Sequence, residues 1–540
     1  MSSGWWRSVS LALAILLLDI SLTFHNIWPT PAITWRGEIS VELGVYLCVA
    51  ALIGLARRKT PPFSRGALRL LAMAWVLLFV GRYADVTATA LFGRDINLYW
   101  DLRFIPDVVS LLAKAATIRL VVAVVVGIVV LFGVLYAVLR WALGRVAAAA
   151  GDSGERAFVA AVGLIVVALY AGRLRAPALD ALPFGKPVTA TYGRQARVAI
   201  RALRGSKAVA PSPPINATLS RVTGADVLLI FLESYGAVTF DRPAFAERLS
   251  PARAALLAAI DETNRDVVSG FVESPTFGGS SWLAHISLLS GVEVRDPDTN
   301  ALLMAQKRDT MVSTFKRHGY KTIALMPGLW QAWPEGAFYG FDDIYGGVRL
   351  EYMGPQFGWF DIPDQYALAK FDAEEANVEP RAPLFMFFPT ISTHTPFRPT
   401  PPYQPDWQRM LTNRPFEQGA VDKSFDEQAD WLDLGPSYVD AMSYTYTTLT
   451  GYLRANPDRD MVMILLGDHQ PPALVSGEGA PWDVPVHIIA SRRPVLDRLM
   501  AHGFRSGLTP SRPALGPMNT LTTTLLEALG NRESAVARVP

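Results

Sequence analysis

Three ionisable side chains in the second half of the chain could hold a metal ion. Glu233 follows the apolar run 227–232, and Asp468 and His469 follow the apolar run 461–466. Carboxylate oxygens and imidazole nitrogens are ligands of Mg²⁺, Mn²⁺ and Zn²⁺, and three protein ligands leave a position for a nucleophile or a substrate oxygen. An Asp-His pair alone is more often part of a surface loop. The prediction therefore depends on Glu233 lying beside this pair.

A candidate nucleophile lies in the stretch 276–291. Two glycines there are followed by Ser280 and Ser281, which begin an amphipathic helical pattern that ends at Gly291. The unpaired N–H groups and the dipole of a helix N-terminus favour an anionic phosphate. A serine at this position can equally be an ordinary N-cap. On these grounds both serines are candidates.

The sequence predicts different roles for three histidines. His394 follows the apolar run 385–388 and is a third polar residue at the end of such a run. His285 lies one helical turn after Ser281 and could face the same site, although a core position is more common. His487 lies within an apolar strand pattern, which favours a hydrogen-bonded core histidine.

Short apolar runs predict the elements that position these side chains. Continuous apolar runs of strand length alternate with helical stretches at 243–259 and 438–453. This alternation is typical of an α/β domain whose mainly parallel sheet is covered on both faces. Ligands of open α/β sheets bind at the carboxyl ends of the strands. The runs expected to be strands are 227–232, 322–326, 385–388 and 461–466.

The first 175 residues predict a multi-pass α-helical membrane domain. The chain is 51% hydrophobic, and its long apolar runs lie in this part. A bilayer core needs about 20 apolar residues. Five segments are expected to cross, of which the second is the shortest: 6–24, 41–55, 68–92, 118–143 and 158–174. The sole cysteine is Cys48, so no disulfide forms within one chain.

Basic loops predict the orientation. Arginines and lysines lie between the second and third spans and between the fourth and fifth, and basic short loops stay in the cytoplasm. Residues after 175, and the loop 93–117, would then lie outside. Residues 176–221 are expected to form a linker in which 192–204 is either a basic interfacial helix or a plain solvated helix. Residues 222–540 would form the extracytoplasmic catalytic domain. The net charge of +2 gives no indication of nucleic-acid binding.

The order of these motifs resembles the alkaline phosphatase and sulfatase superfamily. The resemblance rests on four segments, which are FLESYG with Glu233, the helix of Ser281, THTPF with His394 and GDHQP with Asp468 and His469. With five spans before them, the chain resembles the membrane branch that contains lipoteichoic acid synthases, periplasmic-glucan phosphoglycerol transferases and phosphoethanolamine transferases. The resemblance implies a bacterial plasma-membrane enzyme with its catalytic domain outside the cytoplasm.

The resemblance also implies roles for these residues. The family's nucleophile precedes the glycine that ends its helix by ten residues, which selects Ser281 and leaves Ser280 as the alternate. Glu233, Asp468 and His469 are implied to bind one divalent ion (Mn, Zn or Mg), possibly with a second ion, together with Ser281. His394 is implied to bind phosphoryl oxygens or to protonate the leaving group.

One substrate residue has a partial match. Trp330 matches a tryptophan with which lipoteichoic acid synthases contact their substrate, but the arginine expected two residues later is Ala332. Trp333 and Arg398 could compensate, although core packing and solvation are the ordinary roles of such residues. The departure weakens the expectation of phosphoglycerol more than that of phosphate chemistry.

Three functions are compatible with the sequence. The first is transfer of a phospholipid headgroup phosphate, either phosphoglycerol or phosphoethanolamine, to a glycan or lipid acceptor through a phosphoserine. The second is a membrane-anchored phosphodiesterase or phosphatase, and the third is a catalytically silent membrane scaffold. Sulfate hydrolysis is disfavoured because residues 282–285 read Trp-Leu-Ala-His, without the Pro and Arg of the sulfatase signature. The absence of cysteine from the polar half disfavours the disulfide-rich lipid A type of phosphoethanolamine transferase.

Overall fold

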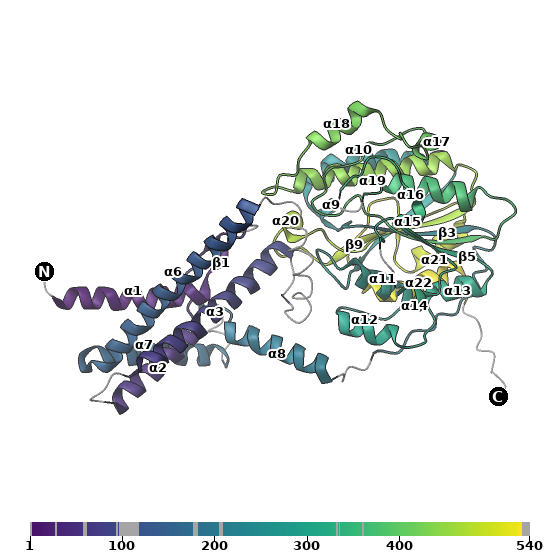
Figure 1. Ribbon diagram of the computed structural model, residues 1–540. Coiled ribbons are helices and arrows are strands. Elements are labelled where there is room, and N and C mark those ends of the chain that lie inside the picture. Colours follow the sequence, from purple (N-terminus) through teal and green to yellow (C-terminus); the bar gives the residue numbers. More distant parts are fainter. Residues whose placement is uncertain are drawn as a thin grey trace. The chain divides into compact units, whose positions relative to one another are not determined.

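The chain divides into two units, which are described separately from a computed structural model (Figure 1). The first contains residues 1–91 and 95–206, and the second contains residues 92–94 and 207–540. The structure describes residues 3–27, 30–57, 62–92, 96, 118–175, 182–204, 209–330, 333, 335–358 and 361–531. The predicted outer loop 93–117 lies, apart from residue 96, outside the described residues.

Helices dominate the first unit. Among the residues that the structure describes, four helices are long and apolar enough to cross a membrane, and a shorter apolar helix occupies the second predicted span. The helices are α1 (Ser3–Thr23), α2 (Val41–Ala56), α3 (Arg65–Phe92), α6 (Ile118–Gly151), α7 (Ser153–Arg173) and α8 (Val188–Arg204), with a hairpin of β1 (His25–Asn26) and β2 (Ile33–Thr34). All five predicted spans are therefore helical, although α2 has only 16 residues.

Helices α2 and α7 approach each other closely because both carry glycine. A Cβ added at Gly163 of α7 would lie 2.9 Å from the backbone nitrogen of Cys48 and 3.0 Å from the carbonyl oxygen of Gly44. In apolar surroundings, small residues allow helices to gain dispersion energy through backbone contact. This contact packs the short helix α2 against a longer one.

Helix α8 includes the whole predicted basic helix 192–204, and it packs on α3 within the same unit. The Tyr192 hydroxyl donates to the carbonyl oxygen of Leu77 at 2.6 Å, and Arg194 pairs with the buried Asp85 at 3.2 Å. The adjoining part of the predicted linker belongs to the second unit, where Ile215 is buried in a hydrophobic core. The interfacial position of α8 remains a prediction.

An eight-stranded, mainly parallel sheet forms the centre of the second unit. Its order is β10-β4-β9-β8-β3-β7-β5-β6, in which the five strands from β8 to β6 are parallel and β9 runs antiparallel to β8. The strands are β3 (Asp226–Leu232), β4 (Asp266–Glu273), β5 (Lys321–Met326), β6 (Asp343–Gly346), β7 (Leu384–Pro389), β8 (Met461–Gly467), β9 (Asp483–Ala490) and β10 (Arg505–Ser506). The four predicted strands and the α/β fold class are confirmed.

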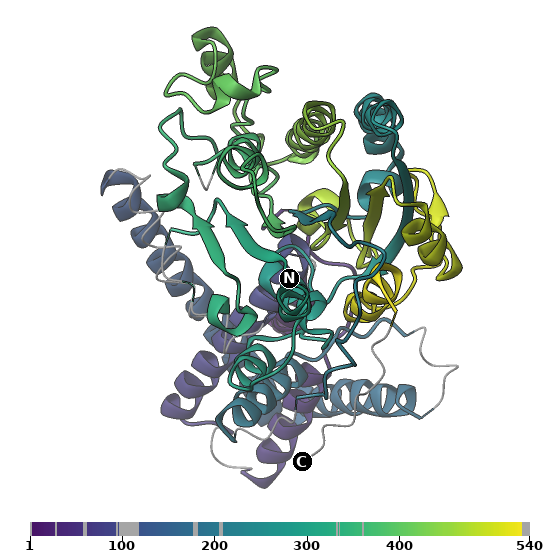
Figure 2. The ribbon, with the colours of Figure 1, turned by 90° about the vertical axis from the view of Figure 1, so that its right-hand side faces the viewer.

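Helices cover both faces of this sheet (Figures 1 and 2). One face carries α10 (Pro243–Glu262), α16 (Asp364–Phe371) and α19 (Gly435–Ala455), and the other carries α11 (Ser281–Ser290), α13 (Met311–Arg317), α21 (Arg493–Ala501) and α22 (Met518–Leu529). The remaining helical segments are α9 (Val238–Asp241), α12 (Pro297–Met304), α14 (Glu335–Tyr339), α15 (Gly347–Leu350), the π-helix η3 (Asp372–Ala376), α17 (Trp407–Met410), α18 (Gln418–Asp426) and α20 (Ala473–Ser476).

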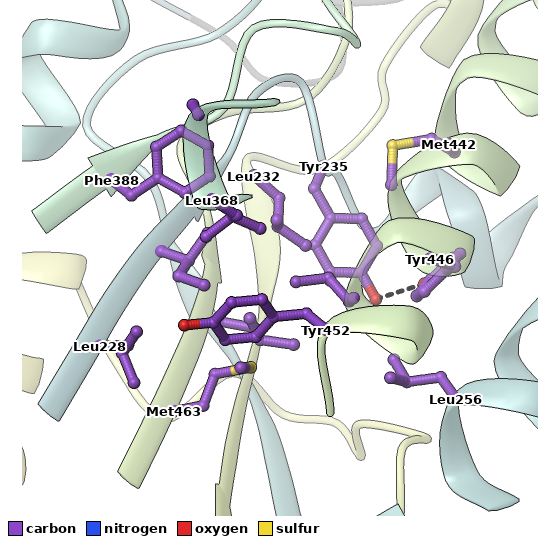
Figure 3. Packing of buried hydrophobic residues seen from close by; sticks show 14 of the residues in the cluster. Leu228, Leu232, Tyr235, Leu256, Leu368, Phe388, Met442, Tyr446, Tyr452 and Met463 are labelled. Carbon is purple, nitrogen blue, oxygen red and sulfur yellow. Dashed lines mark hydrogen bonds between the residues drawn. The ribbon is translucent and has the colours of Figure 1, made fainter. Parts of the chain in front are cut away.

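Two hydrophobic cores explain why the central strands are apolar throughout. Along β3, Leu228 and Leu232 point into the core beneath α10 and α19, where Tyr446 and Met463 also pack (Figure 3). The alternate residue Leu229 points into the opposite core. Since successive side chains of a strand point to opposite faces, a strand covered on both sides has no polar position. Every residue of β3 and β8 is buried.

Candidate metal centre and nucleophile

Strand pairing brings the predicted metal ligands together. Strands β3 and β8 are adjacent and parallel, and Leu232 pairs with Gly467 at the last register position. Glu233 and Asp468 therefore leave the sheet side by side although 235 positions separate them along the sequence. Glu233, Asp468 and His469 are all buried, and one ligand atom from each lies within 4.8 Å of the others.

Sharp turns after both strands direct these side chains. Ser234 has a positive φ of 57°, and its backbone N–H donates to Asp468 Oδ1 at 2.8 Å. The same oxygen accepts the backbone N–H of His469 at 2.7 Å, while the Ser234 hydroxyl donates to Glu233 Oε1 at 3.0 Å. A Cβ at Gly467 would lie 1.9 Å from the carbonyl oxygen of Tyr235, so only glycine allows the two turns to approach this closely.

Ser281 is the first residue of α11, and its side chain reaches this cluster. Its Oγ lies 2.9 Å from Glu233 Oε2 and 3.1 Å from His469 Nε2. Ser280 precedes the helix in the left-handed conformation, with φ of 62° and no side-chain cap hydrogen bond. This conformation, which is unfavourable for residues other than glycine, turns the chain abruptly into the helix. The geometry therefore brings Ser281, rather than Ser280, to the three candidate ligands.

The two buried carboxyl groups share an environment that separates their pKa values. Burial acts to raise the pKa of Glu233, but the charges of His469 and His394 and hydrogen bonds from Asp468 and Ser281 outweigh it and hold the pKa below its usual value. Burial and the neighbouring Glu233 raise the pKa of Asp468 well above its usual value. Two ionised carboxyl groups this close repel each other, and a cation between them would relieve the repulsion.

His469 has the orientation of a metal ligand. Its Nδ1 lies 2.7 Å from the carbonyl oxygen of Gln470, an acceptor that requires the proton on Nδ1. Nε2 therefore offers a lone pair toward Ser281 and the carboxylates, as in histidines whose second nitrogen is fixed by a backbone carbonyl. Burial also lowers the pKa of His469, which favours this neutral form.

These residues fit a divalent cation. Two carboxylate side chains and one neutral imidazole converge, and Ser281 Oγ completes a set of four donors. Within the described residues, the ion-pair partner of both acids is His469, and burial, which lowers the pKa of His469, weakens this compensation. An ion at this position would supply the missing positive charge.

The loop after β7 carries His394 to the same edge of the sheet. The Thr393 hydroxyl donates to the carbonyl oxygen of Glu233 at 2.5 Å, so the loop is bonded to the metal-ligand turn. His394 Nδ1 lies 2.8 Å from the carbonyl oxygen of Thr395, which places its proton on Nδ1 and leaves Nε2 as the other reactive position. His394 also helps to lower the pKa of Glu233, as expected for a near neighbour.

The predicted substrate residue Trp330 lies farther along this edge. It follows β5, two strands from β3, and is 45% exposed. Its ring packs over Gly347, where an added Cβ would lie 2.8 Å from ring atoms. Trp333 packs against Tyr339 and the adjacent hydrophobic core, which is an ordinary structural role. Ala332 lies outside the described residues.

Arg398 has carboxylate partners that occupy its guanidinium group. It forms ion pairs with Glu427 and, at 2.5 Å, with Asp440 of α19. The expectation of a solvated arginine is wrong, because the side chain joins the segment after His394 to α19. The same pairing opposes the alternative that Arg398 replaces the missing substrate arginine.

The two remaining histidines are buried, with different surroundings. His487 Nε2 lies 2.9 Å from the Tyr235 hydroxyl and its Nδ1 lies 2.6 Å from Ser269 Oγ, which confirms a hydrogen-bonded core histidine. His285 lies between the rings of Phe231 and Phe387, and its Nε2 has no hydrogen-bond partner among the described residues. Both Glu233 and His469 affect the pKa of His285, which burial lowers to about 3.

Sequence reasoning did not select several residues that build the site. Ser234 and Thr393 bond directly to Glu233, and Thr390 accepts the backbone N–H of Glu233 at 3.0 Å. Their positions just after the ends of β3 and β7 could have indicated them. The buried Asp364 bonds to the His394 loop from α16. No local signal distinguishes it from an ordinary aspartate at a helix start.

Comparisons with known proteins agree with the fold. The family model described as Sulfatase matches residues 283–486, a segment that includes His394, Asp468 and His469. The matched segment lies within the second unit, and the predicted resemblance to the superfamily is confirmed. Glu233 and Ser281 lie before the matched segment. A search of curated proteins found no match.

Several solved structures match part of the chain at low sequence identity. The lipoteichoic acid synthase LtaP from Listeria monocytogenes is 13% identical, with a TM-score of 0.39, and the match covers 63% of this chain and 78% of that one. The Streptococcus pyogenes phosphoglycerol transferase GacH, in complex with sn-glycerol-1-phosphate, is 13% identical with a TM-score of 0.35 and covers 62% and 80%. The periplasmic domain of EptC from Escherichia coli is 13% identical with a TM-score of 0.33 and covers 52% and 76%.

Proposed function

We propose that this sulfatase-family domain transfers a phosphate-linked headgroup from a membrane phospholipid to an extracytoplasmic glycan or lipid acceptor, with Ser281 as the nucleophile. The observation that carries the proposal is the position of Ser281 Oγ, 2.9 Å from Glu233 Oε2 and 3.1 Å from His469 Nε2. A serine kept only as a helix cap would have no reason to contact two buried candidate ligands. Its place at the N-terminus of α11 adds backbone N–H groups that favour an incoming phosphate.

The first half-reaction forms a phosphoserine. The Oγ of Ser281 attacks phosphorus, an Oγ–P bond forms, and the P–O bond to diacylglycerol breaks. The hydroxyl proton leaves along the hydrogen bond to Glu233 Oε2, and the lowered pKa of Glu233 favours the ionised form that can accept it. A divalent ion held by Glu233, Asp468 and His469 would lower the pKa of the serine hydroxyl and neutralise charge on the phosphoryl oxygens.

His394 is assigned to the leaving group. Because its Nδ1 donates to the carbonyl oxygen of Thr395, a second proton can be carried only on Nε2. From there it can pass to the departing diacylglycerol oxygen, so that the lipid leaves as an alcohol. In the second half-reaction the acceptor hydroxyl gives its proton to the same nitrogen while its oxygen bonds to phosphorus. The Oγ–P bond breaks, and Ser281 Oγ takes back the proton held by Glu233.

The apolar helices of the first unit support a lipid donor. Four helices have the length and composition to cross a bilayer. An enzyme tethered to a bilayer meets lipid headgroups at a high effective concentration. We place the protein in a bacterial plasma membrane with five spans and the catalytic domain outside the cytoplasm. The known transferases named above have the same general fold, although the donor headgroup and the acceptor are not determined by that likeness.

One experiment tests the proposal. The full chain in detergent micelles is incubated with phosphatidylglycerol or phosphatidylethanolamine and with Mn²⁺, Mg²⁺ or Zn²⁺, and diacylglycerol release is measured. Intact-mass spectrometry of the trapped enzyme then identifies the group added to Ser281. We expect diacylglycerol and an added headgroup phosphate. Release of free headgroup phosphate without an added acceptor would instead indicate a phosphodiesterase, and no release with any metal would refute lipid-dependent catalysis.

A further inference from the structure

The loop that carries His394 is held in place by groups that do not react. On one side it is bonded to the backbone of Glu233, which donates its N–H to Thr390 Oγ1 at 3.0 Å and accepts the Thr393 hydroxyl at 2.5 Å. These bonds fix residues 390 and 393. The two residues between them, Ile391 and Ser392, point their backbone N–H groups away from Glu233 toward α16.

Asp364 receives both of these N–H groups. Its Oδ1 accepts from Ile391 at 2.9 Å, and its Oδ2 accepts from Ser392 at 2.9 Å. Asp364 is the first residue of α16, but its side chain is used by the loop and not by its own helix, whose N-cap Pro363 makes no side-chain bond. The carboxylate therefore joins a core helix to the His394 loop.

Burying the carboxylate of Asp364 to hold this loop costs free energy. Asp364 is 2% exposed, and no ion pair to it occurs among the described residues. Burial raises the pKa of Asp364 to about 6, against the opposing effect of the hydrogen bonds from Ser392 and Ile391. An uncompensated buried charge is destabilising, and charge-assisted bonds from two N–H groups recover only part of the cost. A carboxylate has the geometry to hold two adjacent N–H groups at once.

We propose that Asp364 is a positioning residue, which holds the backbone of residues 391 and 392 and thereby places His394 beside the reacting phosphate. This role rests on the proposed function. Asp364 acts through the loop and touches no reacting atom. Loss of the anchor moves His394 without removing it, so the affected quantity is the rate of the chemical step. Binding of the lipid donor depends on other contacts.

The test uses Asp364→Asn in the full chain, because the amide keeps one acceptor oxygen and turns an NH₂ donor toward a backbone N–H. Asp364→Ser serves as a second variant if the first does not fold. The matched control is Asp372→Asn, which alters another buried aspartate, bonded to Tyr452, Asn456 and Arg459. Melting temperature, kcat and KM for diacylglycerol release, and amide hydrogen exchange of a peptide spanning residues 390–396 are measured.

We expect kcat to fall about 10- to 100-fold with KM nearly unchanged, as for an ångström-scale displacement of a catalytic group. Exchange of the 390–396 peptide should rise in the Asp364 variants and not in Asp372→Asn. The decisive comparison is made in a His394→Ala background, where Asp364→Asn should cost almost nothing further because the two changes affect one step.

Two results would overturn the assignment. Unchanged exchange at 390–396 would show that Asp364 does not hold the loop. An equal loss of kcat with and without His394 would show that it acts by another route. If the wild-type chain releases no diacylglycerol, it is the proposed function that fails, because the exchange measurement reports on the anchor without turnover.

Discussion

Replacing Asp468 by Asn should have opposite effects on stability with and without a divalent ion. The backbone N–H groups of Ser234 and His469 both donate to Oδ1 of Asp468. An asparagine oxygen in that place keeps both. The other oxygen, Oδ2, faces His469 Nε2 at 3.8 Å and the cluster. The substitution therefore removes a charge and a metal ligand while preserving the turn.

The size of the effect follows from the distances. The ligand atoms of the cluster lie within 4.8 Å of one another. Two ionised carboxylates about 4.8 Å apart repel by about 3.5 kcal/mol at an effective dielectric constant of about 20. Protonating an acid with an ordinary pKa of about 3.9 at a pH of about 7.5 costs about 5 kcal/mol. Because repulsion between the two ionised acids costs less than this, it sets the free-energy cost of the cluster without metal. Without metal, Asp468→Asn should stabilise the domain by about 3 kcal/mol.

Metal binding reverses the order of stabilities. An ion present at about 1,000 times its Kd stabilises the wild-type domain by about 4.1 kcal/mol, which exceeds the variant's advantage of about 3 kcal/mol, and the variant, which lacks one of three ligands, gains much less. Thermal melting of the full chain in detergent measures both effects, in EDTA and in MnCl₂ or ZnCl₂. One kcal/mol corresponds to about 2 °C in a domain of this size, so the variant should melt roughly 6 °C above the wild type in EDTA and roughly 2 °C below it in metal.

The control is Asp226→Asn, at the opposite end of β3. Asp226 is buried and paired with Arg381 at 2.7 Å. Its replacement should lower the melting temperature equally in EDTA and in metal. If Asp468→Asn melts below the wild type in EDTA, the two acids do not oppose each other as reasoned. If metal raises the melting temperature of variant and wild type alike, Asp468 is not a ligand.

Three further predictions address the nucleophile, a core histidine and the substrate contact. Ser281→Ala should lose turnover by roughly 10³-fold or more, while Ser280→Ala keeps most of it; the reverse outcome would move the nucleophile by one residue. Burial lowers the pKa of His487 to about 3 from its ordinary 6.5. Between the two pKa values only the unfolded chain binds the proton. The free energy of unfolding should therefore decrease as the pH is lowered, by about 2 kcal/mol from about pH 8 to pH 5. His487→Gln should melt with a weaker dependence over this range, and an unchanged dependence would show that His487 is not its source. Trp330→Ala should raise KM several-fold with kcat retained if the exposed ring contacts the lipid headgroup, whereas an unchanged KM would exclude that contact.

Much of the fold could be read from local pattern. The apolar runs that became β3, β5, β7 and β8 are buried on both faces, and that burial is why they are almost entirely apolar. The exception is Thr322 of β5, whose hydroxyl bonds to Asp342. Helix α10 begins at the predicted residue 243 and ends three residues later than predicted, and α19 extends the predicted 438–453 at both ends. The edge strands β10 and β6 and the strand β4 beside β10 were not predicted, because partly polar or very short segments resemble loops.

The choice between Ser280 and Ser281 shows where local pattern stops. Both are serines at the start of the same helix, and either satisfies the chemistry of a nucleophile. The left-handed conformation of Ser280 and the first-turn position of Ser281 decide which hydroxyl reaches Glu233. Such a decision depends on two dihedral angles that the neighbouring strands impose. The ten-residue spacing before Gly291, taken from the family resemblance, favoured Ser281, and the geometry supports that choice.

The sequence by itself determined the residue types that can do phosphate chemistry, the strands they follow and the apolar helices that precede them. These properties are local, since hydropathy, turn residues and side-chain chemistry act over a few positions. Only the tertiary structure decided that β3 and β8 are neighbours in register, so that Glu233 meets Asp468. It alone placed Asp364 under the His394 loop. Strand order and the partners of a buried carboxylate are set by packing between distant segments, and no local pattern of residues carries that information.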